Sequence, residues 1–262
     1  MIANSTMCEL LGINSNYPVE MRTLLGLFAR RGGATADNPD GWGLAYFDGN
    51  DFLLHKAPEA AADSALLLSL SETIRSNLVI AHVRKANPPT SHTLANTHPF
   101  VRGCCGRHWV FAHNGKVPEL LQSGGCCHPQ LSHPLGDTDS EHAFYFLLDE
   151  IAGVFTGSDS VKTAIWLQTL AKLSGAIAAY GQFNFLLSDG ERLIAYGHDR
   201  LHRLQQNHGD HKVALIASEP LTDENWEVFR PGQLQVYEGG ELQVSLQPDV
   251  RLAHDPVCAL NT

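Results

Sequence analysis

The sequence predicts a layered α+β protein whose strands pair mainly antiparallel. Short β-rich runs lie towards both ends of the chain, and adjacent helical stretches lie between them. This order differs from the regular alternation of strand and helix that is typical of a parallel sheet. The 262 residues, 44% hydrophobic and 18% charged, are enough for one domain with a substantial core. We therefore expect a single layered domain and exclude a small disulfide-stapled module.

Hydrophobic periodicity predicts the individual elements along the chain. Apolar residues recur at helical spacing over residues 20–31, and a second helix is expected over 64–75. A capping-box pattern, Thr138-Asp139-Ser140-Glu141, precedes an apolar run and predicts that a helix begins there, with another helix over about 161–173. The expected strands cover residues 8–13, 42–47, 78–83, 108–113, 183–187, 193–196, 213–218 and 234–237.

The charge balance limits the classes of partner. The chain has 18 Lys and Arg against 28 Asp and Glu, so its net charge of −10 repels polyanions, and nucleic acid is not an expected partner. No uninterrupted apolar run approaches the roughly 18 residues of a membrane-spanning helix. Residues 1–7 also lack the basic start and apolar stretch of a secretory signal. We expect a cytoplasmic protein that does not bind membranes and whose cysteines stay reduced.

Cys8 is the first candidate for chemistry. It opens an apolar strand and follows Met7, a second possible initiator methionine. If Cys8 became the first residue, its thiol would lie beside its own α-amino group, whose ordinary pKa of about 8 lets it accept a proton near neutral pH. One residue would then supply both nucleophile and base. We expect residues 1–7 to be removed or not translated, and residues 8–262 to form the single domain.

Four further residues could complete an acyl-transfer site. Asn114 and Gly115 follow an expected strand and could offer a side-chain amide and a main-chain N–H to an oxyanion, although the pair alone favours a hairpin turn. Arg84 ends the strand over 78–83, where its guanidinium could bind a carboxylate through two parallel hydrogen bonds or lie in solvent. Asp139 could bind an ammonium group, or could instead favour the dipole of the helix whose first turn it occupies.

Six ordered blocks of sequence span about residues 7–245. In chain order they are Met7-Cys8-Glu9-Leu10-Leu11-Gly12, Arg30-Arg31-Gly32-Gly33 followed by Asp40-Gly41-Trp42-Gly43, Ala81-His82-Val83-Arg84 with Asn96-Thr97-His98-Pro99-Phe100, Ala112-His113-Asn114-Gly115, Gly136-Asp137-Thr138-Asp139-Ser140-Glu141, and Ala217-Ser218-Glu219-Pro220-Leu221-Thr222. On these blocks the sequence resembles the class II glutamine amidotransferases. These are N-terminal-nucleophile enzymes with a four-layer αββα fold, and the resemblance is closest to the short branch that includes γ-glutamyl hydrolases.

The resemblance implies catalytic roles for three residues. Cys8 would be the nucleophile, with its freed amine as general base, and Asn114 and Gly115 would form the oxyanion hole. The implied reaction is cysteine-dependent cleavage of the γ-amide of glutamine or of a γ-glutamyl compound through a thioester, without a cofactor. Two alternatives stay open. The ammonia could pass to a separate synthase subunit, or the chain could be a non-catalytic scaffold that retains residues 1–7.

The resemblance also implies a substrate pocket. Arg84 would bind the α-carboxylate of the glutamyl group, Asp139 would bind its α-ammonium group, and His98 would be a structural part of the pocket. Arg31 and residues 41–43 would shape the loop over Cys8. In the larger family members this arginine is commonly followed by Trp-Ala-Thr-His, whereas residues 85–88 here are Lys-Ala-Asn-Pro.

Two pairs of adjacent cysteines raise a zinc-binding alternative. The candidate ligands are Cys104, Cys105, Cys126, Cys127, His108, His128 and His133. Adjacent cysteines lack the two-to-four-residue spacing that lets two thiolates reach one tetrahedral metal ion. We therefore expect loop thiols and no metal.

Overall fold

Two antiparallel sheets form the centre of the molecule. The computed structural model describes residues 7–86, 93–118, 134–155 and 160–247. The seven-stranded sheet has the order β11-β9-β10-β1-β4-β2-β3, and the six-stranded sheet has the order β13-β12-β8-β7-β6-β5. The strands of the first sheet are β1 (Glu9–Glu20), β2 (Trp42–Phe47), β3 (Phe52–Ala57), β4 (Arg75–Val83), β9 (His202–His208), β10 (His211–Ala217) and β11 (Glu227–Val228). Those of the second are β5 (Phe100–Cys104), β6 (Arg107–Lys116), β7 (Gln182–Ser188), β8 (Leu193–Gly197), β12 (Gln233–Glu238) and β13 (Glu241–Leu246).

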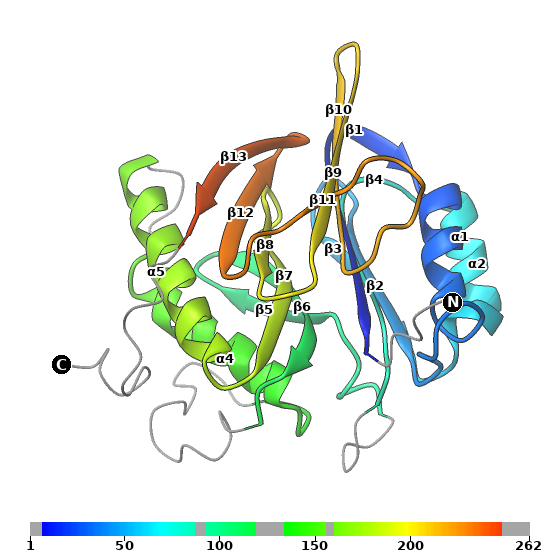
Figure 1. Cartoon of the computed structure of the whole chain (residues 1–262), viewed down its shortest axis with the longest axis horizontal. Coiled ribbons are helices and arrows are strands. Elements are labelled where there is room, and N and C mark those ends of the chain that lie inside the picture. Colours follow the sequence, from blue (N-terminus) through cyan, green and yellow to red (C-terminus); the bar gives the residue numbers. More distant parts are fainter. Residues whose placement is uncertain (1–6, 87–92, 119–133, 156–159, 248–262) are drawn as a thin grey trace.

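Helices cover the outer face of each sheet (Figure 1). Helices α1 (Arg22–Arg30) and α2 (Ala65–Thr73), with the short 3-10 helix η1 (Ala61–Asp63), pack on the seven-stranded sheet. Helices α4 (Asp139–Ala152) and α5 (Ser160–Ala178) pack on the six-stranded sheet. The four layers are therefore helix, sheet, sheet and helix, which confirms the predicted αββα fold.

Three apolar cores hold these layers together, and they follow from the alternation of side chains along each strand. On β1, Leu11 and Ile13 face the core under α1 and α2, whereas Leu10 faces the core between the sheets. Gly12 lies on the same face as Leu10, and a Cβ there would press against Leu186 and Leu193 of the opposite sheet. The start of β1 therefore lies close against the second sheet.

The structure confirms the helix boundary at Thr138 and corrects a turn. The Thr138 side chain accepts a hydrogen bond from the Glu141 N–H (3.2 Å), as the capping pattern predicts. The hairpin-turn interpretation of residues 114–115 is wrong, because β6 continues through Asn114 and Gly115, which pair with Asn184 and Phe183 of β7. Strands β3, β5, β9, β11 and β13 were not predicted from the sequence.

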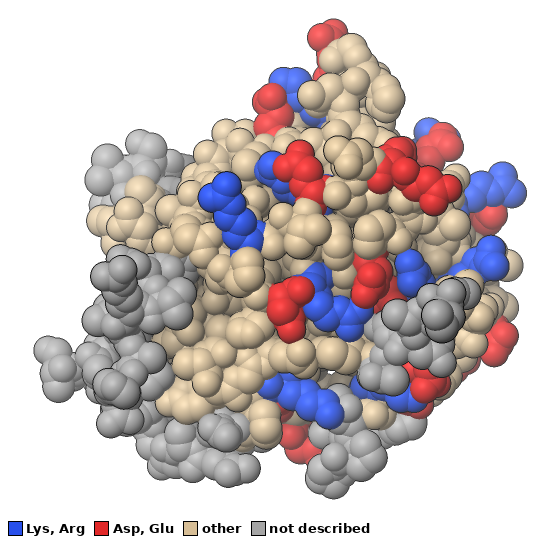
Figure 2. Space-filling view, in the orientation of Figure 1, with Lys and Arg blue, Asp and Glu red and all other residues tan. Residues whose placement is uncertain are grey.

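The surface agrees with the charge pattern of the sequence. On the face shown in Figure 2, basic and acidic side chains are interspersed and form no extended patch of one sign. Within the described ranges, no helix combines the length and the apolar character that crossing a membrane requires.

Candidate active site

Cys8 lies directly before the central strand β1. Its Sγ accepts a hydrogen bond from the main-chain N–H of Lys85 (3.2 Å) and lies 3.3 Å from the Lys85 carbonyl oxygen, to which the thiol can donate. Burial raises the pKa of the Cys8 thiol, while the Lys85 N–H and the positive charge of Arg84 act in the opposite direction. The thiol is therefore protonated and needs a base before it can act as a nucleophile.

Asn114 approaches Cys8 from the opposite sheet. Its side chain is fully buried on β6, and its Nδ2 donates a hydrogen bond to the main-chain carbonyl of Cys8. The next residue, Gly115, has φ of +147°, and a Cβ at this position would overlap the Gln182 carbonyl oxygen. Only glycine fits there without strain. Asn114, one of the two predicted oxyanion donors, thus contacts the main chain of the predicted nucleophile, and Gly115 follows it on β6.

Asn184 holds this part of β6 in place. It is fully buried on β7, and its Nδ2 donates to the Asn114 carbonyl oxygen (3.2 Å) and to Asp199 (2.8 Å). Its Oδ1 accepts from the main-chain N–H groups of residues 198–200, at 2.8, 3.0 and 3.2 Å. Asn184 was not among the predicted site residues, although a polar amide within the apolar run over 183–187 was a usable signal.

Arg84 is buried at the end of β4, beside the start of β1. Only 4% of its surface is exposed, so the solvent alternative is wrong. Its main chain is fixed by the loop that precedes β2, since its N–H donates to Gly41 (2.8 Å) and its carbonyl accepts from Asp40 (3.1 Å). Burial lowers the Arg84 pKa, and the charges of Cys8, Asp40 and Asp137 oppose this. The guanidinium is thus an enclosed cation near the Cys8 thiol.

Asp139 is the first residue of α4 and binds the segment that follows Gly115. Its Oδ2 accepts from the Val117 N–H (2.6 Å), and its Oδ1 accepts from the Ser140 hydroxyl (3.2 Å). Ser140 in turn contacts His113 Nδ1 (2.8 Å), so the carboxylate is tied to β6 through two routes. Asp139 therefore positions the chain after the predicted oxyanion hole, and each of its oxygens keeps a further lone pair for a ligand.

His98 lies in a cluster of buried rings behind these groups. Its ring centroid is 4.4 Å from that of His82, 4.6 Å from that of Phe100 and 6.5 Å from that of His113. Burial holds the His98 pKa well below its ordinary value and lowers that of His82 to about 3, so both rings are neutral. A Cβ on Gly43 would overlap the His98 carbonyl oxygen. This location fits the expected structural role of His98 in the wall of the site.

A charged cluster that was not predicted from the sequence surrounds Glu9, the residue after Cys8. Glu9 is buried, and its Oε2 lies 3.8 Å from Nε of Arg31, whose Nη2 donates to the Pro220 carbonyl (2.9 Å). An ion pair between Arg200 and Glu219 lies next to it. Burial raises the Glu9 pKa to about 7. The signal available in the sequence was an acidic residue within an otherwise apolar strand.

The predicted site residues thus divide into two groups. Asn114 contacts the main chain of Cys8, the charge of Arg84 acts on the Cys8 thiol, and Asp139 binds Val117, two residues after Gly115. His98 lies apart from these groups, against the rings of His82 and Phe100.

For the zinc alternative, residues 126, 127, 128 and 133 lie outside the described ranges, and the described histidines, cysteines and acidic residues contain no group of three suited to a metal ion.

Comparison with known proteins identifies the family. The family model for class II glutamine amidotransferases matches residues 7–209 and 204–258 of this chain. The chain belongs to the class II glutamine amidotransferases. A crystal structure described as a predicted glutamine amidotransferase from Pseudomonas aeruginosa PA01 is 31% identical, with a TM-score of 0.67 over 90% of this chain and 100% of that one.

Two curated relatives of this amidotransferase support the same assignment. The Escherichia coli protein YafJ, named provisionally as a glutamine amidotransferase, is 32% identical over 90% of this chain and 99% of its own. A γ-glutamyl-hercynylcysteine sulfoxide hydrolase from Mycobacterium tuberculosis is 29% identical over 72% of this chain and 70% of its own. The protein is therefore an enzyme of the amidohydrolase type that acts on a small molecule.

Proposed function

We propose that this amidotransferase cleaves the γ-amide of glutamine or of a γ-glutamyl compound through a thioester on Cys8. The observation that supports the proposal is that the Asn114 amide donates to the Cys8 main chain while the positive charge of the buried Arg84 guanidinium acts on the Cys8 thiol. A nucleophile, an oxyanion donor and a carboxylate-binding cation are the groups that this reaction needs. The γ-glutamyl substrate class is also that of the mycobacterial relative.

The proposed reaction begins with proton transfer from the Cys8 thiol to its own α-amine. The sulfur attacks the γ-carbonyl carbon, and the developing oxyanion accepts hydrogen bonds from the Gly115 N–H and the Asn114 amide. That amide has two N–H donors, so it can serve the oxyanion and the Cys8 carbonyl together. The leaving amine takes the proton as the C–N bond breaks. Water then attacks the thioester, which releases the γ-carboxylate and restores the thiol.

Arg84 and Asp139 would bind the amino-acid end of the substrate. The Arg84 guanidinium would hold the α-carboxylate with two parallel hydrogen bonds, and the Asp139 carboxylate would accept from the α-ammonium group. The mechanism requires that Cys8 be the first residue, because the Met7–Cys8 peptide bond converts the required amine into an amide. We therefore propose that residues 1–7 are absent from the active enzyme and that residues 8–262 form its single domain.

Intact mass, covalent labelling and product release test this proposal. Intact mass of active protein should correspond to a chain that begins at Cys8, and a glutamine-like diazoketone should label Cys8 covalently. Cys8→Ala should abolish both labelling and release of glutamate from glutamine or γ-glutamyl compounds. A scaffold protein would instead keep residues 1–7 and resist labelling. Glutamine turnover that rises sharply only when a synthase subunit is added would favour the ammonia-supplying alternative.

A further inference from the structure

A hollow of about 660 Å³ lies at the end of β6 that is remote from Asn114. It opens between three turns, which connect β2 to β3, β5 to β6 and β7 to β8. At about 3.3 Å per residue, Asn114 lies roughly 23 Å along β6 from Arg107 at this end. The groups around this hollow therefore do not belong to the candidate active site. Among them are two neighbouring thiols, those of Cys104 and Cys105.

The β5–β6 turn brings these two thiols together. Neighbouring side chains on an extended strand point to opposite faces of the sheet. Here Cys104 pairs with Arg107, and the two residues between them have positive φ, +57° for Cys105 and +77° for Gly106. This left-handed pair closes the hairpin and places the two Sγ atoms 2.7 Å apart. Cys105 is the only non-glycine residue with positive φ in the described ranges.

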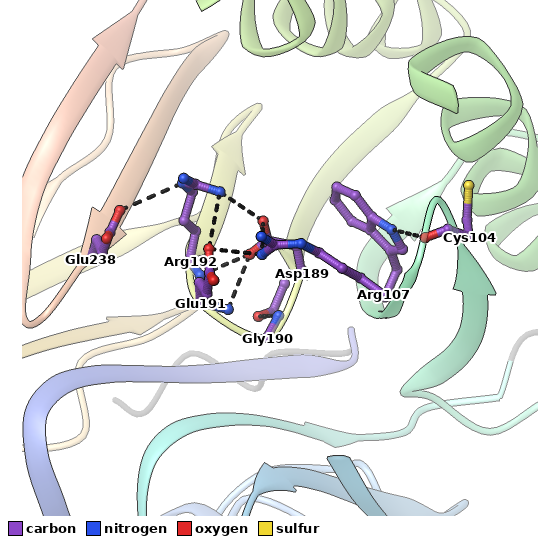
Figure 3. Close-up of polar contacts among 9 residues, drawn as sticks. Cys104, Arg107, Asp189, Gly190, Glu191, Arg192 and Glu238 are labelled. Carbon is purple, nitrogen blue, oxygen red and sulfur yellow. Dashed lines mark hydrogen bonds and ion pairs between the residues drawn. The ribbon is translucent and has the colours of Figure 1, made fainter. Parts of the chain in front are cut away.

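Contacts on both sides hold the turn in this shape. The Arg107 guanidinium reaches Glu191 (2.8 Å) and Asp189 (3.4 Å) in the β7–β8 turn, as Figure 3 shows. On the other side, His108 Nδ1 lies 2.7 Å from Asp51. Trp109 Nε1 also donates to the Cys104 carbonyl oxygen (3.1 Å). The two thiols are thus kept adjacent by groups outside the turn.

We propose that Cys104 and Cys105 form a reversible disulfide by exchange with a small-molecule disulfide, which makes this turn a redox modification site. The exposed Cys105 thiolate attacks one sulfur of the small disulfide, forms a mixed disulfide and expels one thiolate. The Cys104 sulfur then attacks Cys105 Sγ, loses its proton and expels the second thiol. The protein pair is oxidised by two electrons, and the small disulfide is reduced to two thiols.

The surroundings decide the order of attack and the reversibility. Burial, with the neighbouring Cys105 adding to it, raises the Cys104 pKa to about 12, so Cys105 reacts first. Adjacent Cα atoms are about 3.8 Å apart, below the usual range of about 4.4–6.8 Å for disulfide-bonded residues. The bond is therefore strained, and strained exposed disulfides are readily reduced again.

Peptide mapping after equilibration in glutathione buffers tests the proposal. Trypsin cleaves after Arg102 and Arg107, and the peptide over residues 103–107 carries no other cysteine. The folded protein is equilibrated at a series of ratios of oxidised to reduced glutathione, quenched with acid, alkylated and digested. We expect this peptide to lose two hydrogen atoms and to remain free of glutathione. The C104S variant should instead retain glutathione on Cys105, because the resolving thiol is missing.

The matched control is the free peptide with the sequence of residues 103–107. The strain of a disulfide between adjacent residues is common to protein and peptide, whereas only the folded turn holds the thiols together, so we expect the protein to reach half-oxidation at a glutathione ratio at least tenfold less oxidising than the peptide requires. Equal ratios for protein and peptide would overturn the proposal. So would a wild-type protein in which Cys105 accumulates as the glutathione adduct.

Discussion

The side-chain amide of Asn114 donates a hydrogen bond to the main-chain carbonyl of Cys8, and this bond joins the two sheets. Asn114 belongs to β6 of the six-stranded sheet, whereas Cys8 precedes β1 of the seven-stranded sheet. The proposed nucleophile and its oxyanion donor are therefore positioned by the packing of one sheet on the other. Substitutions in the core between the sheets should change the distance between Cys8 and Asn114.

Asn114→Ala should reduce kcat for glutamine hydrolysis by about 10²–10³-fold, because loss of one oxyanion donor costs about 2.7–4 kcal/mol of transition-state stabilisation. Steady-state kinetics on protein that begins at Cys8 measures this, and thermal unfolding checks that the variant is folded. KM should change little. A folded variant whose kcat falls less than threefold would show that Asn114 does not stabilise the oxyanion.

Arg84→Lys should raise KM for glutamine by at least about tenfold although the charge is kept, because an ammonium group cannot form the two parallel hydrogen bonds of a guanidinium. Lys85→Arg is the matched control, since it changes the next residue, whose Nζ pairs with Asp37 (2.6 Å). The control should leave KM nearly unchanged. Equal KM values for wild type and Arg84→Lys would argue against a carboxylate at Arg84.

Glu9→Gln should remove a component of the pH dependence of stability. The carboxyl ionises near pH 4.5 in the unfolded chain and near pH 7 when folded. Between these values the unfolded state has lost the proton that the folded state keeps, so the free energy of unfolding falls as pH rises, by up to about 3 kcal/mol. Urea unfolding across this range measures the change.

The matched control for Glu9→Gln is Glu20→Gln, at the exposed far end of the same strand. This control should retain the wild-type loss of stability with rising pH. If Glu9→Gln and wild type lose stability in parallel over that range, the Glu9 carboxyl does not titrate as described.

Gly43→Ala should destabilise the protein by a few kcal/mol, because the added Cβ overlaps the His98 carbonyl oxygen and main chain must move. Gly26→Ala, in helix α1 with open space around the position, is the control and should stabilise by about 0.5–1 kcal/mol. Denaturant unfolding compares them. A neutral Gly43→Ala variant would contradict the close packing of β2 against the His98 segment.

Much of the fold was predictable because its elements have strong local signals. The strand over 42–47 and the helix that begins after Thr138 agree with the structure, since an apolar run and a capping box are both encoded locally. Strand β13 was missed although Glu241–Leu246 alternates strictly between polar and apolar residues, which is a usable strand signal. The end of β6 was misjudged because pairing with β7 overrides the turn preference of Asn-Gly.

The candidate site was predictable only where a residue type is tied to one chemistry. Cys8 and Arg84 could be singled out because a thiol and a guanidinium have few substitutes. For Glu9 and Asn184 the sequence offered only a polar residue within an apolar strand, and their partners, which are distant in the sequence, could not be predicted. Contacts of this kind arise only when the chain folds.

Asn184 binds three successive main-chain amides of the β8–β9 connection through one oxygen and holds Asn114 through its nitrogen. The position of Asn114, the proposed oxyanion donor, is thereby linked to a bend of the chain over residues 198–200. Sequence changes in that bend therefore offer natural selection, or an engineer, a way to shift the Asn114 amide without altering any of the residues proposed to contact the substrate.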